Sequence, residues 1–532
     1  MKLKKSLLCA WSPVLLVGST FIITSCAKND NGQNPIDPIP PTPTNPNTPY
    51  SYEPHLYKKM PIIRIDTQDK NNTFATERKD IYVSDGNDSY DFVKQEFPYQ
   101  NATITVENLD DNLIRKDLLA QVKVRGNTTT IYDKKPFRIK FTENQEMLSL
   151  NNKYAFKDWV LLANWRDVSM LRNNVGLYLG QFLYKDQGLY ASDFVNVELY
   201  LNGEYWGVYL LCEQNEVATE RVNIEKPVTD YQGTNIGYLL EMDSYARFEP
   251  ALEQIKIDYE GESIISPINT YTIKSKIYNE TQRTFIEKYL ENIYKIIYRS
   301  IVKKECWEFN NDKTDIVKST TISDPNKALE NVVDINSVVS LCILQEIICD
   351  YDVNNSSFYM SIDLSPTGNG KLHFQAPWDF DFALGMCEDL PPANLSDDYN
   401  GSFIEYWYTT NPWLKILYSS DLIKKLIKDR WAEMKEHLVQ DKILRYIDDI
   451  SNLYVSNYKA NYDKWKNIAP YIEEEVKKNE NNKNPNETSN YDDLYYAIKS
   501  EANWGCTTQK EAADYLKSWL KNRFDTLDSI WK

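Results

Sequence analysis

The pattern of residues 194–211 predicts a β-hairpin. Apolar and polar side chains alternate strictly from Phe194 to Leu201, and a second β-rich run covers residues 205–211. Such alternation is the period of a strand that places one face in a core. Asn202-Gly203 lies between the runs, and a two-residue hairpin turn needs the positive φ angles that these residues tolerate. The chain therefore contains an antiparallel sheet whose apolar face must pack against other elements.

Further strands are predicted in the preceding part of the chain. Residues 122–125 and 137–141 alternate apolar and polar side chains, and residues 62–65 and 102–106 are short β-rich runs. Both patterns are typical of strands that are buried on at least one side. The N-terminal part of the body is thus expected to be rich in β-structure.

Helical patterns dominate the rest of the sequence. Residues 168–186 and 335–348 carry apolar side chains at spacings of three and four, as do residues 422–438 and 516–527 near the C-terminus. Residues 357–362 and 371–376 are predicted strands on either side of a glycine-rich turn, and residues 477–490 are a predicted exposed loop. The expected fold class is α+β, with an N-terminal β-rich part and a helical C-terminal region.

The N-terminus has the features of an export signal. Lysines at positions 2, 4 and 5 precede a mostly apolar run, and small residues lead to Cys26. We therefore predict a signal peptide over residues 1–25 and lipidation of Cys26, as in bacterial lipoproteins. Residues 31–49 contain seven prolines, and residues 26–50 are predicted to form a lipid anchor and an extended tether. The expected location is the outer membrane or the cell surface, outside the cytoplasm.

Charge and composition exclude several functions. The formal net charge is −17, and −20 without the three lysines of the predicted signal, so no nucleic-acid partner is expected. The chain has three histidines far apart in sequence, and its cysteines match no zinc-ligand spacing. Six cysteines follow Cys26, an even number that permits disulfides in an exported protein.

A short acidic motif is the first candidate for chemistry. Asp379 and Asp381 flank Phe380 directly after a predicted strand. A turn there would bring both carboxylates onto one hard cation, and Mg²⁺ prefers oxygen ligands of this kind. The simpler interpretation is a capping or salt-bridged pair of acids.

Asp352 and Asn355 form the second candidate, between a predicted helix and a predicted strand. In kinases a catalytic-loop Asp accepts the proton of the attacking hydroxyl, and an Asn downstream binds the metal. Asp350 is a competing acid, and an ordinary polar turn would have the same composition.

A basic segment is the third candidate. Arg125 precedes a glycine turn, and Lys135, Arg138 and Lys140 follow within fifteen residues. Cations beside a glycine turn can hold phosphate. The alternative interpretation is an exposed charged hairpin.

The order of these motifs along residues 60–390 resembles the CotH family of spore-coat, kinase-like proteins. The most specific parts are Asn-Gly-Glu-Tyr-Trp-Gly-Val-Tyr at 202–209 and Pro-Trp-Asp-Phe-Asp at 377–381. The resemblance implies an atypical protein-kinase-like domain over residues 51–400, with the helical residues 401–532 packed on it. It also implies ATP and Mg²⁺ (or Mn²⁺) as cofactors and phosphoryl transfer to Ser or Thr of a protein acceptor.

The resemblance further implies roles for individual residues. Asp379 and Asp381 would hold the metal, and Asp352 would be the catalytic acid–base residue, assisted by Asn355. Arg125 and one of Lys135, Arg138 or Lys140 would contact nucleotide phosphates, and Glu213 would pair with the lysine.

Two functions remain open at this point. The chain is either a lipid-anchored kinase or a catalytically inactive surface protein that binds a partner or another ligand on the same scaffold. ATP is scarce outside the cytoplasm, which favours the binder. The presence of Arg125, Asp352, Asp379 and Asp381 together favours the enzyme.

Overall fold

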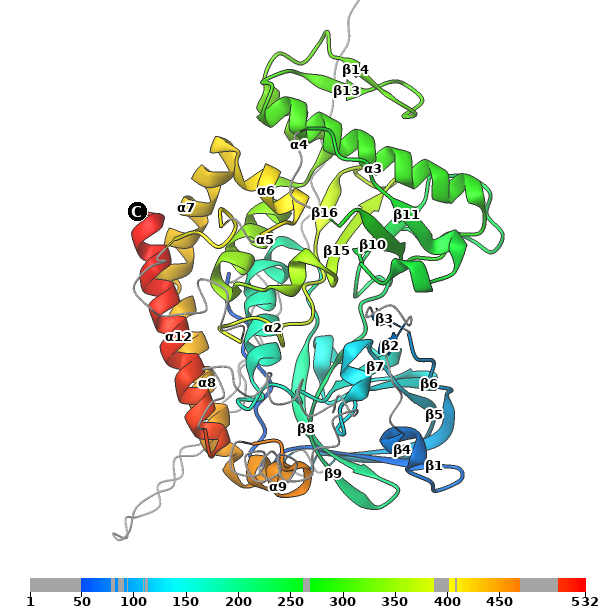
Figure 1. The fold of residues 1–532 in the computed structure, drawn as a ribbon, viewed down its shortest axis with the longest axis vertical. Helices are drawn as coiled ribbons and strands as arrows, with labels where there is room; N and C mark the ends of the chain where they lie inside the picture. Colours follow the sequence, from blue (N-terminus) through cyan, green and yellow to red (C-terminus); the bar gives the residue numbers. More distant parts are fainter. Residues whose placement is uncertain are drawn as a thin grey trace, which may run out of the picture. The chain divides into compact units, whose positions relative to one another are not determined.

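Residues 62–213 include the seven strands of a closed barrel (Figure 1). The computed structural model describes residues 49–77, 82–84, 90–92, 94–108, 110, 113–261, 268–386, 401–406, 409–468 and 506–532. In their order around the barrel the strands are β1 (Ile62–Thr67), β4 (Gln100–Asn108), β5 (Leu113–Val124), β6 (Phe137–Gln145), β7 (Phe156–Leu162), β9 (Glu204–Glu213) and β8 (Phe194–Leu201). Their inward side chains make a separate apolar core.

The predicted hairpin is confirmed as β8 and β9, which pair antiparallel from Phe194–Cys212 to Leu201–Glu204. Its turn residues Asn202 and Gly203 have φ angles of 50° and 83°. The barrel closes because β1 pairs in parallel with β8, far away in sequence. Local patterns could not reveal this pairing.

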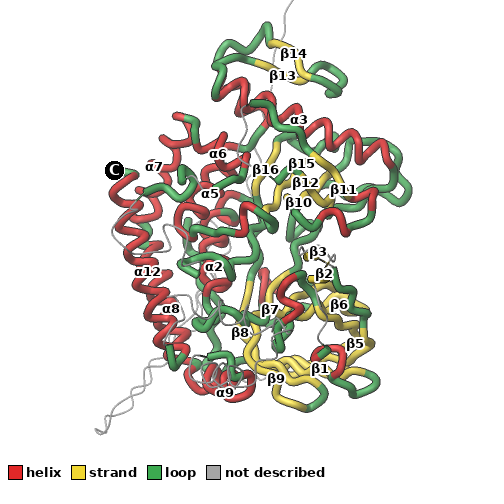
Figure 2. Tube along the Cα trace, in the orientation of Figure 1, coloured by secondary structure: helices red, strands yellow, loops and turns green. Residues whose placement is uncertain are grey.

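A second sheet of five strands follows, in the order β11-β12-β10-β15-β16 (Figure 2, yellow). Its strands are β11 (Gln254–Lys256), β12 (Thr270–Ile273), β10 (Gly237–Met242), β15 (Phe358–Asp363) and β16 (Leu372–Phe374). The shorter hairpins are β2 (Tyr82–Ser84) with β3 (Tyr90–Phe92), and β13 (Trp307–Phe309) with β14 (Ile316–Lys318). The predicted strands 357–362 and 371–376 correspond to β15 and β16.

Two buried helices lie at the centre of the main apolar core, α2 (Arg172–Leu183) and α5 (Ile335–Ile348). The other helices are α1 (Thr73–Thr76), α3 (Glu280–Ile301), α4 (Pro325–Val332), α6 (Pro412–Tyr418), α7 (Asp421–Glu436), α8 (Val439–Leu453), α9 (Val455–Trp465) and α12 (Gln509–Ile530). Helix α12 packs on α5 and α8, α8 packs on α2, and α9 packs on β9. The mixture of helices and sheets confirms the α+β class. None of the described helices has the length and apolar character that crossing a bilayer requires.

Several predictions differ from the described structure or fall outside it. Residues 168–186 contain a shorter helix, α2, followed by a short 3₁₀ turn at Lys185–Gln187. The predicted signal peptide, Cys26, most of the tether and the loop 477–490 lie outside the described residues. The five described cysteines are free thiols: Cys212, Cys306, Cys342, Cys349 and Cys506.

The segment that follows the predicted tether is held by partly buried polar contacts. The Tyr50 amide donates to Asp186 Oδ2 at 2.6 Å, and Lys442 Nζ donates to the Tyr50 carbonyl at 2.6 Å. Tyr52 Oη donates to Asp193 Oδ1 at 2.5 Å, and His55 Nε2 lies 3.0 Å from Asp193 Oδ2. These contacts attach the segment to the residues between α2 and β8 and to helix α8.

His55 predicts a pH dependence of stability. Burial alone would lower the pKa of His55, but the Asp193 carboxylate and its hydrogen bond raise it above the usual range, while Lys185 opposes and Glu146 adds to this effect. The stabilisation is complete below the unfolded pKa of about 6.5 and is lost as pH rises through the folded pKa. His55→Gln should therefore destabilise the protein more near pH 5.5 than near pH 8.5, by on the order of 1 kcal/mol, in urea unfolding.

His373 provides a control of opposite sign. Burial lowers the pKa of His373, so protonation there opposes folding. His373→Gln should gain stability relative to the wild type as pH falls. A His55→Gln effect that is equal at both pH values would contradict the assigned charge.

Candidate active site

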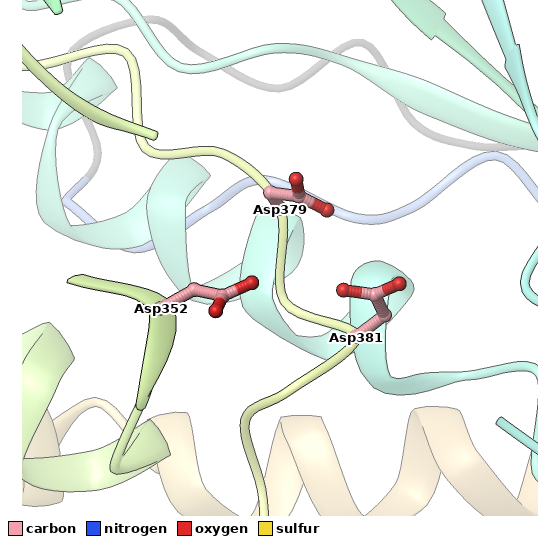
Figure 3. A group of neighbouring side chains, drawn as sticks. All are labelled: Asp352, Asp379 and Asp381. Atoms are coloured by element: carbon pink, nitrogen blue, oxygen red, sulfur yellow. The ribbon is translucent and has the colours of Figure 1, made fainter. Parts of the chain in front are cut away.

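Three carboxylates converge at one point, from two segments of the chain (Figure 3). Asp379 and Asp381 lie on the loop after β16, and Asp352 lies in the turn between α5 and β15. One oxygen of each carboxylate lies within 4.8 Å of the others. All three side chains are half-buried, whereas Trp378 and Phe380 are buried. The alternating motif thus directs its aromatic rings into the protein and its acids toward solvent.

Helix α2 is the platform of the acidic loop. The Phe380 amide donates to Asn173 Oδ1 at 2.9 Å, and Asn173 Nδ2 donates to Asn164 Oδ1 at 2.9 Å. The Phe380 ring lies against Gly176, where a Cβ would come within 2.3 Å of it. Asp379 has a φ of 66°, which is unusual for a residue other than glycine. Strain of this kind persists only where the surroundings hold it, as Asn173 and Gly176 do here.

Gly176→Ala should therefore damage both the fold and the acid cluster. Overpacking costs about 1–3 kcal/mol, reduced by about 1 kcal/mol of improved helix propensity. Displacing Phe380 also moves the acids on both sides of it, so metal binding should weaken as well. Gly180→Ala is the matched control on the same helix, because its Cβ would lie 3.1 Å from Pro377 and should change the unfolding free energy by less than about 1 kcal/mol. Equal effects of the two substitutions in chemical denaturation would contradict the platform role.

The Asp352 turn begins where α5 ends at Cys349, which has a φ of 51°. Asp350 is buried, and its Oδ1 accepts from the Asp352 amide at 3.0 Å. Asp350 therefore holds the backbone of the turn, and Asp352 supplies the carboxylate of the cluster. Asn355 follows half-buried, and its carbonyl accepts from the Ser244 amide at 2.9 Å. Its predicted assistance to Asp352 stays a prediction.

The clustered acids disturb one another's protonation. Burial raises the pKa of Asp352 to about 7, with a further contribution from Asp379 and an opposing one from Arg166. The pKa of Asp381 lies well above its usual value because of burial and the charges of Asp379 and Asp352. Burial also raises the pKa of Asp379, against the opposing charge of Arg125. A cation bound between these carboxylates would stabilise their ionised form.

Arg125 is the one predicted basic residue that the structure brings to the acids. It follows β5, and its guanidinium lies 5.9 Å from the ring centre of Trp378, next to Asp379 in sequence. Its charge acts directly on Asp379. The early basic segment therefore reaches the acids through Arg125.

The structure gives the other predicted nucleotide contacts different partners. Lys135 Nζ is buried and donates to the carbonyls of Thr130 and Tyr132, both at 2.7 Å. Arg138 pairs with Asp158 at 2.8 Å, and Lys140 is exposed on β6.

The predicted pairing of Glu213 with a lysine is wrong. Glu213 pairs with Arg221 at 3.1 Å, and both side chains are fully buried. Asn151 Nδ2 also donates to Glu213 Oε1 at 2.9 Å. Arg221 follows Glu213 by eight residues, beyond the end of β9, and the sequence does not show that the chain turns back to bring the two side chains together.

Sequence reasoning missed two residues that act on the acids. Arg166 acts electrostatically on Asp352 and Asp381. Glu241, on β10, acts on Asp379 and pairs with Lys274 at 2.7 Å. Neither Arg166 nor Glu241 lies in a recognisable motif, and only the charge of Arg166 inside an apolar stretch could have been noticed in the sequence.

The described elements define an α+β protein with a three-carboxylate centre between a helix-terminal turn and a strand-terminal loop. Residues 122–527 match the sequence model of the family described as CotH kinase protein. The match covers more than half of the chain, so the protein belongs to the CotH family, which confirms the resemblance in its motifs. No curated protein matches the chain.

Proposed function

We propose that the protein is an atypical, protein-kinase-like phosphotransferase that moves a phosphoryl group from ATP to Ser or Thr of a protein acceptor. The observation that carries this proposal is the convergence of Asp352, Asp379 and Asp381. Their placement follows the order of a kinase centre, with an acidic turn, a two-strand hairpin and then a second acidic motif. Membership of the CotH kinase family supports the same function.

The residues present fit a divalent cation. Three carboxylates offer hard oxygen ligands, the set that Mg²⁺ or Mn²⁺ takes together with phosphate oxygens. Mutual repulsion and burial disfavour the ionised form of these acids. A bound cation would favour the ionised form. Asp379 and Asp381 would hold it, and it would supply charge neutralisation on the phosphates.

The remaining steps fall to the residues of the chain. Asp352 accepts the proton of the acceptor hydroxyl as the oxygen attacks the terminal phosphorus. The bond between that phosphorus and the bridging oxygen breaks, and ADP leaves with the electron pair. Arg125 lies beside Asp379 and Trp378, where its guanidinium can bind phosphate oxygens through paired donors. We further propose that lipid on Cys26 holds this domain at the outer membrane or cell surface.

The test is transfer of labelled phosphate from ATP, with wild type and Asp379→Ala compared in Mg²⁺ and in Mn²⁺. Wild type should label an acceptor protein or itself, and the variant should not. Melting temperatures with and without nucleotide test binding separately, because a bound ligand stabilises the folded state by mass action. Absence of both labelling and a nucleotide-dependent shift would overturn the kinase and leave the surface binding protein.

A further inference from the structure

Arg166 is the one residue with exposed surface in a long buried stretch. Arg166 is half-buried, whereas all the remaining residues from Asp158 to Tyr184 are buried. Its guanidinium lies over the Phe382 ring, 3.8 Å from the ring centre. Phe382 follows Asp381 directly, so this stacking places a cation beside the acid cluster.

The backbone just before Arg166 is fixed by buried donors. Asn467 Nδ2 donates to the Trp165 carbonyl at 2.9 Å, and Lys134 Nζ donates to the Ala163 carbonyl at 2.8 Å. The carboxylate of the next residue, Asp167, binds groups at the start of α2. It caps the start of α2 through the Leu171 and Arg172 amides and pairs with the Arg172 side chain. Arg166 therefore has a preset position, and the acid beside it in sequence is committed to α2.

Arg125 and Arg166 act electrostatically on different acids of the cluster. Arg125 lies over Trp378 and acts on Asp379, whereas Arg166 lies over Phe382 and acts on Asp352 and Asp381. The motif Trp378–Phe382 thus has an arginine stacked on the aromatic ring at each end and acids between them. Phosphoryl transfer depends on cations that neutralise charge developing on the transferred group.

We propose that Arg166 contacts the terminal phosphoryl group of the nucleotide from the Asp352 side of the cluster, opposite Arg125. This assignment rests on the proposed kinase function. A planar guanidinium binds two phosphate oxygens at once, and it can do so while it stacks on an aromatic ring. A contact with the terminal phosphate alone would affect the binding of ATP and not that of ADP. A residue that binds the rest of the nucleotide, or that only balances the charge of the acids, would not discriminate between the two.

The test compares wild type with Arg166→Gln and Arg166→Lys for binding of Mg–ATP and Mg–ADP, measured by melting temperature and calorimetry. Arg166→Gln should weaken Mg–ATP binding about 10- to 100-fold and leave Mg–ADP binding nearly unchanged. Transfer of labelled phosphate should fall about 10²–10³-fold. Arg166→Lys should recover only part of the loss, because lysine lacks the paired donors.

Arg64→Gln is the matched control, since Arg64 also stacks on an aromatic ring, 4.3 Å from the centre of Tyr200, and pairs with Glu107. It should leave both nucleotide affinities unchanged. If Arg166→Gln weakens the binding of ATP and of ADP equally, or changes neither affinity, the assignment of Arg166 is wrong. Phosphate transfer by the wild type would still support the kinase function in that case. A wild-type protein that responds to neither nucleotide overturns the kinase, and this assignment with it.

Discussion

Asp381→Asn should abolish phosphate transfer and, at the same time, raise the melting temperature of the metal-free protein. Asp381 is one of three carboxylates within 4.8 Å, and the charges of Asp379 and Asp352 act against its ionisation. An amide of the same shape removes the repulsion and also a metal ligand. We expect transfer to fall at least about 10³-fold and the metal-free melting temperature to rise by about 1–3 °C.

The measurement pairs a transfer assay with melting curves in chelator and in Mn²⁺. Wild type should be stabilised by Mn²⁺, and Asp381→Asn should be stabilised much less. Asp429→Asn is the control, because Asp429 is an exposed acid paired with Lys425 on α7, and such pairs contribute about 0–1 kcal/mol. A metal-free Asp381→Asn protein that melts below the wild type, yet still responds fully to Mn²⁺, would show that the acids are a structural network.

Arg523→Met should destabilise the protein by about 3–5 kcal/mol, because it leaves a buried carboxylate without its cation. Arg523 lies on α12, and its Nη2 donates to Glu346 Oε2 at 2.7 Å. Both side chains are almost completely buried, with 3% and 0% exposed. Its Nε also donates to the Glu346 carbonyl at 2.6 Å, and its Nη1 donates to the Gly401 carbonyl at 2.8 Å.

The same substitution should affect the site. Glu346 lies near the end of α5, a few residues before Asp352, and it also accepts from the Phe403 and Ile404 amides at 2.8 and 3.1 Å. Loss of Arg523 therefore loosens the helix end that positions the acidic turn. Folded Arg523→Met protein should bind Mn²⁺ more weakly than wild type.

Urea unfolding measures the stability loss. Lys517→Met on the same helix removes a half-exposed pair with Asp448 and should cost less than about 1 kcal/mol. Glu346→Gln combined with Arg523→Met should recover part of the loss, since no buried charge is then left unpaired. Equal effects of the Arg523 and Lys517 substitutions would contradict the importance of the buried pair.

Local patterns predicted much of the secondary structure and the acids of the site. The periodicity of α5 and of the β8–β9 hairpin is visible in a short local segment of sequence. Asp379 and Asp381 belong to a short motif whose carboxylates indicate a cation site. Helix α2 shows the limit of such patterns. Its periodicity predicts one buried face, but all of its residues are buried because it contacts α5 and α8 as well as the acidic loop.

The basic residues were predicted less well, for a physical reason. Sequence shows that Lys135 is charged, but only the folded turn shows its ammonium satisfying two carbonyls in the interior. Likewise Glu213 pairs with Arg221, which follows it by eight residues, and Arg166 approaches the acids through stacking on Phe382. The Arg166 contact joins residues far apart in sequence, which periodicity and motif spacing do not encode. Lys135 and Glu213 bind groups nearby in the chain, but the sequence does not show how the chain turns to bring those groups to them.

The parallel pairing of β1 with β8 affects how copies of the protein meet. An open sheet of this size would present a row of unsatisfied amides and carbonyls at each end, and such rows recruit strands from neighbouring molecules. Closure leaves the barrel without terminal strands. Proteins concentrated side by side can therefore collide through these barrels without the backbone-to-backbone zippering that begins fibrous aggregates.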